Sequence, residues 1–88
     1  MTPADRADVF RGMAHPLRRR VLRRLVRGEA SVGDLRTMLG VTPQTLSRHL
    51  AVLRETGLIS QRLIGRRRAY RLRGRAFQRA RRWITQLD

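Results

Sequence analysis

The chain of 88 residues contains no cysteine and no lysine, and it has only four aromatic and six acidic residues. The lack of cysteine excludes disulfides, thiolate metal sites and a cysteine nucleophile. No apolar run approaches the roughly 20 residues that cross a bilayer. Residues 1–11 include Asp5 and Asp8 and lack an apolar signal core. We therefore expect a cytoplasmic protein without a membrane partner.

The chain is rich in positive charge. Its 21 basic residues are all arginine, and its net charge is +15. A polyanionic partner is the direct inference, since the arginine fork matches both phosphate and the guanine edge. A GC-rich coding bias also accounts for arginine in place of lysine, but not for the charge itself. Because 41% of the residues are hydrophobic and regularly spaced, we expect one folded domain over residues 1–88 with a thin core.

Capping residues, prolines and glycines divide the first two thirds of the chain into helices. A capping hydroxyl, a first-turn proline or acid, and a terminal glycine are typical helix boundaries. They predict helices from Pro3 to about Met13, from Pro16 to Gly28, from Ser31 to Gly40 and from Thr42 to about Glu55. The last two, which occupy about residues 31–56, have the layout of a helix-turn-helix.

From Leu58 the hydrophobic period changes from 3.6 to 2. Residues 58–64 and 68–72 are predicted strands joined across Gly65, which form a wing over about residues 58–73. A final amphipathic helix is expected over about residues 75–87. The predicted fold is mainly α with a β-hairpin wing, a winged helix-turn-helix in the order α-α-α-α-β-β-α.

Three segments together resemble one known family: Ala14–Leu22, Ser31–Leu35 and Thr45–Ile59. The third carries the pattern Ser-x-His-Leu-x-x-Leu-x-x-x-Gly-Leu, and a basic hairpin that ends in Tyr-x-Leu follows it. Both features are similar to the recognition helix and wing of the arsenic-repressor (ArsR-type) family of bacterial winged-helix regulators. The resemblance covers nearly the whole chain. It implies a dimeric repressor that acts on its own operon.

Many members of that family release DNA when a metal binds cysteine, histidine or carboxylate clusters. The third helix, where the thiolate motif lies in the family, reads Leu-Arg-Thr-Met-Leu over 35–39. The last helix carries three arginines over 76–84, and these would repel a metal. The chain therefore resembles the small members without a metal site. We expect no metal and no other cofactor, and an effector stays unknown.

The fourth predicted helix has one apolar sector, which contains Leu46, Leu50 and Leu53. The opposite side is polar, and the N-terminal turns of a recognition helix reach base edges. We expect four residues to contact bases: Gln44, Thr45, Ser47 and Arg48. Glutamine pairs bidentately with adenine and arginine with guanine. The alternative is a helix face that is merely solvated.

A second set of residues is expected to contact the DNA backbone: Thr42, His49, Arg54, Arg66, Arg67 and Arg68, with Arg62, Arg71 and Arg73 as extensions. Clustered like charges in a tight hairpin repel one another unless an anion is near. Such contacts give affinity and salt dependence more than sequence choice. A solvated charge run is the alternative for the hairpin. For His49, packing against the apolar sector is the alternative.

The two terminal helices, 3–13 and 75–87, carry more apolar surface than one thin core covers. The expected dimer interface consists of Val9, Phe10, Met13, Phe77, Trp83, Ile84 and Leu87. A two-fold dimer predicts an inverted-repeat operator with half-sites about one helical turn, or a multiple, apart. The alternative is that both helices pack only on their own domain.

Catalysis is not indicated, and we expect no enzyme. Ser47 and His49 are two apart, so they point to different sides of a helix and cannot form a nucleophile and base pair. The sequence instead predicts a sequence-specific, double-stranded DNA-binding transcriptional regulator, a homodimeric repressor. The alternatives are an RNA-binding, protein-binding or non-specific architectural winged-helix protein. RNA readout usually needs stacking aromatics, whereas all four aromatic residues here lie at apolar positions.

Overall fold

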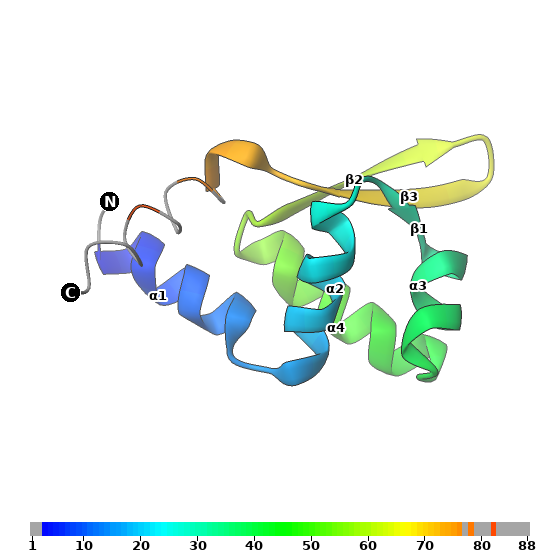
Figure 1. Cartoon of the computed structure of the whole chain (residues 1–88), viewed down its shortest axis with the longest axis horizontal. Helices are drawn as coiled ribbons and strands as arrows, with labels where there is room; N and C mark the ends of the chain where they lie inside the picture. Colours follow the sequence, from blue (N-terminus) through cyan, green and yellow to red (C-terminus); the bar gives the residue numbers. More distant parts are fainter. Residues whose placement is uncertain (1–2, 77, 79–81, 83–88) are drawn as a thin grey trace.

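The computed structural model describes residues 3–76, 78 and 82. Four helices come first: α1 (Pro3–Met13), α2 (Pro16–Val26), α3 (Val32–Leu39) and α4 (Pro43–Glu55). The hairpin of β2 (Ile59–Ile64) and β3 (Arg67–Leu72) follows, and it lies across the helices with its turn projecting past α3 (Figure 1). The predicted winged helix-turn-helix is confirmed. Within the described residues, no helix has the length and apolar character to span a membrane.

The helix boundaries follow from local hydrogen bonds at the helix ends. The His15 Nδ1 atom accepts from the Leu17 N–H at 3.0 Å at the start of α2. Ser31 and Asp34 form a reciprocal capping box at the start of α3, which satisfies two backbone donors that have no partner inside the helix. Gly40 ends α3 with a left-handed φ of 64°.

A two-residue strand, β1 (Ala30–Ser31), is an addition to the predicted order. It pairs antiparallel with β3, Ala30 opposite Tyr70 and Ser31 opposite Ala69, so the sheet has the order β1-β3-β2. Two residues are too few to show a period of 2. The pairing attaches the root of the wing to the residue that caps α3, so the wing and the helix-turn-helix are joined by backbone hydrogen bonds.

The core lies where α1, α2, α3 and α4 meet the root of the hairpin. Leu35, Leu53 and Leu58 are completely buried, and Leu46 is 1% exposed. The chain approaches closely at Gly12, where a Cβ atom would lie 2.6 Å from the Leu58 Cδ1 atom. Glycine in α1 therefore allows this helix to pack directly on the end of α4 and the start of the hairpin.

The expectation that α1 exposes Val9 is wrong. The Val9 side chain is only 5% exposed and packs in the core of its own chain. Met13 is half-buried against the same core, whereas Phe10 is 50% exposed. Of the predicted last helix, residues 75, 76, 78 and 82 are helical. The other expected interface residues lie outside the described residues: Phe77, Trp83, Ile84 and Leu87.

Candidate nucleic-acid interface

The outer face of α4 is polar and open to solvent. Leu46, Leu50 and Leu53 are buried, as their spacing predicts, so the opposite side of the helix points outward. There, Gln44, Ser47 and Arg48 are exposed and line one open concavity with Pro43 and Ala51. Three of the four predicted base-contacting residues therefore lie together on the first two turns of the helix.

Thr45, the fourth, is held differently. It is half-buried, and its Oγ1 atom accepts a hydrogen bond from the Thr42 hydroxyl at 3.0 Å. The Thr42 Oγ1 atom in turn accepts from the Thr45 N–H at 3.2 Å and thereby caps α4. Thr42, expected at the DNA backbone, is exposed but uses its hydroxyl inside the protein. The pair stabilises the turn that carries Gln44.

We expect Thr42→Ala to destabilise the fold by about 1 kcal/mol, because it removes the side-chain acceptor from the first turn of α4. Urea unfolding followed by circular dichroism measures this loss. Thr42→Ser is the matched control, since serine keeps the accepting oxygen. If the serine variant loses as much stability as the alanine variant, the hydroxyl is not the stabilising group.

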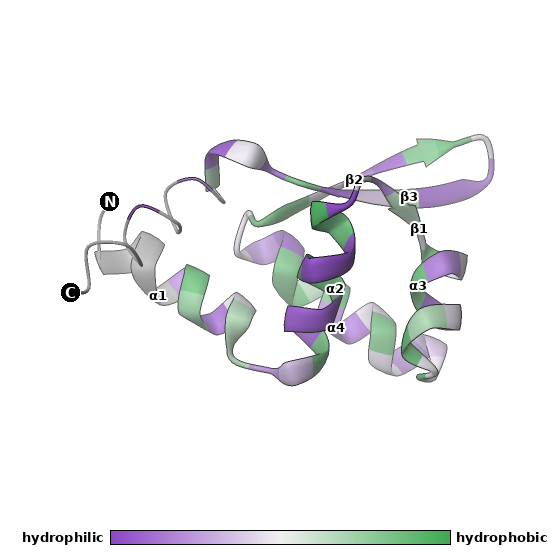
Figure 2. Cartoon of the chain, viewed as in Figure 1, coloured by the Kyte–Doolittle hydropathy of each residue, from purple (hydrophilic) through white to green (hydrophobic). Residues whose placement is uncertain are grey.

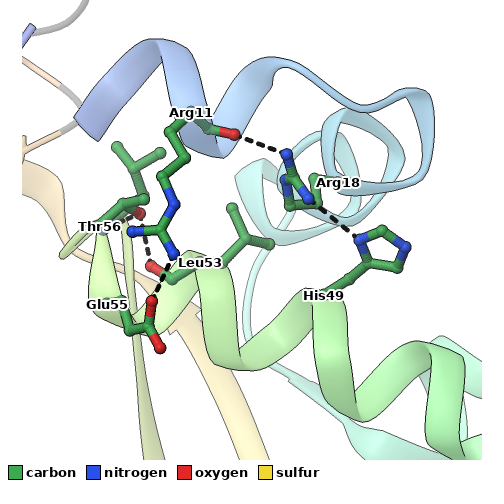
Figure 3. A network of polar contacts seen from close by, with 7 residues as sticks. Arg11, Arg18, His49, Leu53, Glu55 and Thr56 are labelled. Atoms are coloured by element: carbon green, nitrogen blue, oxygen red, sulfur yellow. Dashed lines mark hydrogen bonds and ion pairs between the residues drawn. The ribbon is translucent and has the colours of Figure 1, made fainter. Parts of the chain in front are cut away.

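Arg18 joins three helices behind the recognition face (Figure 3). Its guanidinium donates to the backbone oxygens of Arg11 at 2.7 Å and Gly12 at 3.2 Å, which lie at the end of α1. Its Nη1 atom also lies 3.3 Å from the His49 Nδ1 atom in α4. Farther along α4, the Arg11 guanidinium forms an ion pair with Glu55 at 2.6 Å. These contacts link α4 to α1 and α2.

His49 is half-buried in this junction, and its ring centre lies 4.4 Å from that of His15. Arginine can only donate, so the His49 Nδ1 atom accepts and the ring proton lies on Nε2. Burial lowers the pKa of His49 below its ordinary value of 6.5, and the positive charges of Arg18 and Arg48 act in the same direction. His49 is therefore neutral in the folded protein near neutral pH, and Nε2 is its donor toward any phosphate.

Acidification is expected to destabilise the fold through His49. Because the folded-state pKa is lowered, the unfolded chain binds the proton more readily, so stability falls as the pH drops through about 6.5. The free energy of unfolding measured in urea at several pH values from about 8 to 5 reports this dependence. His49→Gln should have a shallower pH dependence over this range. Identical slopes for both proteins would contradict the assignment.

The tip of the wing carries three exposed arginines, Arg66, Arg67 and Arg68. The last strand pair is Ile64 with Arg67, and Gly65 opens the two-residue loop with a φ of 62°. A positive φ at the first loop position suits the hairpin turn that glycine favours there. The three arginines line an open groove of about 630 Å³ with the first turns of α3. The wing therefore presents its charge beside the helix-turn-helix.

Arg62, expected to extend the DNA-backbone contacts, is paired with a carboxylate of its own chain. Its Nε and Nη2 atoms donate to the two carboxylate oxygens of Glu29 at 2.6 and 2.7 Å. These hydrogen bonds lower the pKa of Glu29, so the carboxylate stays charged and compensates the arginine. The pair ties β2 to the segment before β1. Arg54, Arg71 and Arg73 are exposed.

Two further observations concern the alternatives that the sequence left open. Tyr70 is 4% exposed and donates its hydroxyl proton to the Gln61 Oε1 atom at 3.0 Å, so its ring is not available for stacking on a base. Within residues 3–76, 78 and 82, no group of three or more histidine and carboxylate side chains is placed to hold a metal ion.

Comparison with known proteins gives a consistent picture. A model of the helix-turn-helix domain family matches residues 13–62. A biofilm growth-associated repressor from Xylella fastidiosa (strain Temecula1 / ATCC 700964) is 39% identical over 66 residues, which are 75% of this chain and 58% of that protein. The chain thus spans little more than half the length of this curated relative.

Solved structures match over more of the chain. An ArsR-like transcriptional regulator from Rhodococcus sp. RHA1 aligns over 99% of this chain and 83% of its own, with a TM-score of 0.84 and 30% identity. The transcriptional repressor BigR from Xylella fastidiosa aligns over 93% of this chain and 85% of its own, with a TM-score of 0.74 and 35% identity.

Proposed function

Because the chain belongs to the ArsR-type family of winged helix-turn-helix transcriptional regulators, we propose that it is a homodimeric repressor that binds a specific sequence in double-stranded DNA. One observation carries the proposal. The first two turns of α4 present Gln44, Ser47 and Arg48 to solvent while the leucines behind them are buried. A rigid helix face of this kind suits the major groove.

The two parts of the surface have different tasks in this proposal. Glutamine and arginine on α4 read base edges, because both form bidentate hydrogen bonds with single base types. The arginines of the wing bind phosphates, which gives affinity and orientation but little sequence choice. Thr42 and Thr45 stabilise the first turn of α4, which carries the proposed base contacts. Of the four proposed base contacts, Thr45 is the least exposed. His49 and Arg54 remain proposed backbone contacts from the same helix.

Arg67→Ala is expected to weaken binding to all duplexes alike. It should also reduce the salt slope, the slope of log affinity against log salt concentration, by about 0.9, the value for one lost phosphate contact. Fluorescence anisotropy over a range of salt concentrations on specific and random DNA measures both effects. Arg62→Ala is the matched control, since the Arg62 guanidinium is already hydrogen-bonded to the Glu29 carboxylate. A slope that changes equally in both variants would refute the phosphate role of Arg67.

The proposed dimer brings together the terminal helices of two chains. From α1 we propose Phe10 and Met13, and from the helix that the sequence predicts over 75–87 we propose Phe77, Trp83, Ile84 and Leu87. Val9 is left out because it is buried in its own chain. Each chain of a two-fold dimer would read one half of an inverted repeat, with half-sites about 34–36 Å or a multiple apart. We also propose that repression does not depend on metal sensing.

Selection of duplexes from a random pool tests this proposal, together with the mass of the protein in solution. The expected result is an enriched inverted repeat, bound by a species of twice the chain mass of 10.3 kDa, and a complex that survives added Zn²⁺. Enrichment of no sequence would favour an architectural protein, and a preference for RNA of the same sequence would favour an RNA-binding protein. Either result would overturn the proposal.

A further inference from the structure

Six arginines occupy α2 and its C-cap: Arg18, Arg19, Arg20, Arg23, Arg24 and Arg27. Residues 16–28 contain no acidic residue to compensate them. The structure separates the six into two groups. Arg18 and Arg19 donate to the last backbone oxygens of α1, with Arg19 2.7 Å from the oxygen of Met13. These two arginines therefore stabilise the end of α1 and have a structural role.

The other four, Arg20, Arg23, Arg24 and Arg27, line an open groove of about 240 Å³ with Met38 of α3. We call it the α2 groove. None of its residues belongs to the concavity on α4 or to the groove under the wing. Figure 1 shows α2 between α1 and α3, and Figure 2 shows strongly hydrophilic residues alternating with hydrophobic ones along α2.

Among the described residues, the arginine side chains of the α2 groove have only backbone oxygens as hydrogen-bond partners. Arg20 and Arg24 donate to the backbone oxygens of Met38 at 3.3 Å and Gly28 at 3.1 Å, which orients them but leaves their charge uncompensated. In the described part of the chain, none of the four forms an ion pair. Four clustered like charges repel one another unless an anion lies between them.

The α2 groove and the wing flank the same carboxylate. Hydrogen bonds within the capping box with Ser31 lower the pKa of Asp34, and the charges of Arg24 and Arg67 lower it further. Asp34 is thus hydrogen-bonded within its own capping box, and it lies close enough to the α2 groove and to the wing to be affected by the charges of both. Positive charge therefore continues from the wing, past the start of α3, to α2.

We propose that the α2 groove binds sugar-phosphate backbone of DNA outside the half-site that α4 reads. From Arg20 to Arg27 the helix rises by about 10 Å, so its arginines are far enough apart to contact more than one phosphate of a strand. Arginine suits phosphate because its fork donates two parallel hydrogen bonds. Met38, 38% exposed, adds an apolar surface for deoxyribose.

This inference rests on the proposed DNA-binding function, and its test separates the two. The variant carries Arg23→Gln and Arg27→Gln, since neither side chain forms a hydrogen bond with a backbone oxygen of the described residues, as Arg20 and Arg24 do. The control carries Arg36→Gln and Arg75→Gln, which remove the same charge from two exposed positions that the proposal does not place on DNA. Circular dichroism and thermal unfolding first establish that both variants fold as the parent does.

Anisotropy measures binding of each protein to the selected site with short flanks and with flanks one helical turn longer on each side. A capture assay measures bridging of the labelled duplex to an immobilised second duplex. We expect the parent to gain affinity from the long flanks or to bridge, and the groove variant to lose that gain. The salt slope should then fall by nearly two, about 0.9 per lost phosphate contact. Flank dependence places the phosphates on the same duplex, and bridging places them on a second.

Three outcomes would overturn the inference. The groove variant and the control could behave alike on every duplex, or the parent could show neither flank dependence nor bridging. Poly-glutamate could bind as tightly as the long duplex and lose binding only in the groove variant, which would assign the groove to an acidic protein. If the groove variant loses only the affinity gained from the long flanks, its binding to the short site, and with it the proposed function, is unaffected. If the parent does not bind the short site, the proposed function itself fails.

Discussion

Arg48→Ala is expected to weaken binding to the specific operator by about 5- to 150-fold, which corresponds to the 1–3 kcal/mol that one bidentate base contact contributes. The side chain is exposed on the second turn of α4, beside Gln44 and Ser47, and the helix beneath it is held by buried leucines. The loss should be much smaller on random DNA, because random sequence seldom offers guanine at that position. Fluorescence anisotropy on both duplexes at one salt concentration measures the difference.

Arg54→Ala is the matched control for Arg48→Ala. Arg54 is exposed in the last turn of the same helix, so its replacement removes the same charge far from the N-terminal turns. We expect this control to weaken operator and random DNA by a similar factor. If Arg48→Ala also weakens both duplexes equally, Arg48 contacts phosphate or solvent, and its base-reading role is refuted.

Leu53→Ala is expected to destabilise the fold by about 2–5 kcal/mol, the usual cost of a cavity at a fully buried leucine. Leu53 is 0% exposed and lies where α4 meets α1 near Gly12. A domain of this length has about 4–13 kcal/mol of stability in total, so the variant would lose a large part of it. The same change would loosen the junction that positions α4. Urea unfolding gives the free-energy difference.

Leu63→Ala is the control for this substitution, because Leu63 lies near the end of the wing and is 68% exposed. The same atoms are removed where no cavity can form, and the expected change in stability is within about 0.5 kcal/mol. Comparable losses in both variants would mean that the assignment of Leu53 to the core, and with it the outward direction of the α4 reading face, is wrong.

Local signals in the sequence predicted the helices well. Ser31 with Asp34 and Thr42 with Pro43 specify helix starts within a few residues, and their hydrogen bonds form as the pattern indicates. The side of α4 that faces solvent was predicted in the same way, from the spacing of its leucines. The strand β1 could not be predicted, because it consists of two residues and depends on pairing with Ala69 and Tyr70 far along the chain.

Long-range packing also decided what each arginine does. Arg18 and Arg19 lie beside the end of α1, and Arg62 lies beside Glu29, whereas Arg67 is exposed at the wing. These residues are chemically identical, and their partners become neighbours only when the chain folds. Val9 is a similar case, since the weak apolar pattern of α1 did not show that this residue enters the core.

The most direct test of the account is the affinity of the full chain for three fluorescent ligands at one salt concentration: the selected inverted-repeat duplex, a scrambled duplex of the same composition, and an RNA duplex of the same sequence. If α4 reads bases and the wing binds phosphates, the inverted repeat should bind at least about 1,000-fold more tightly than the scrambled duplex. RNA should bind no better than the scrambled DNA. Equal affinity for all three would contradict the account.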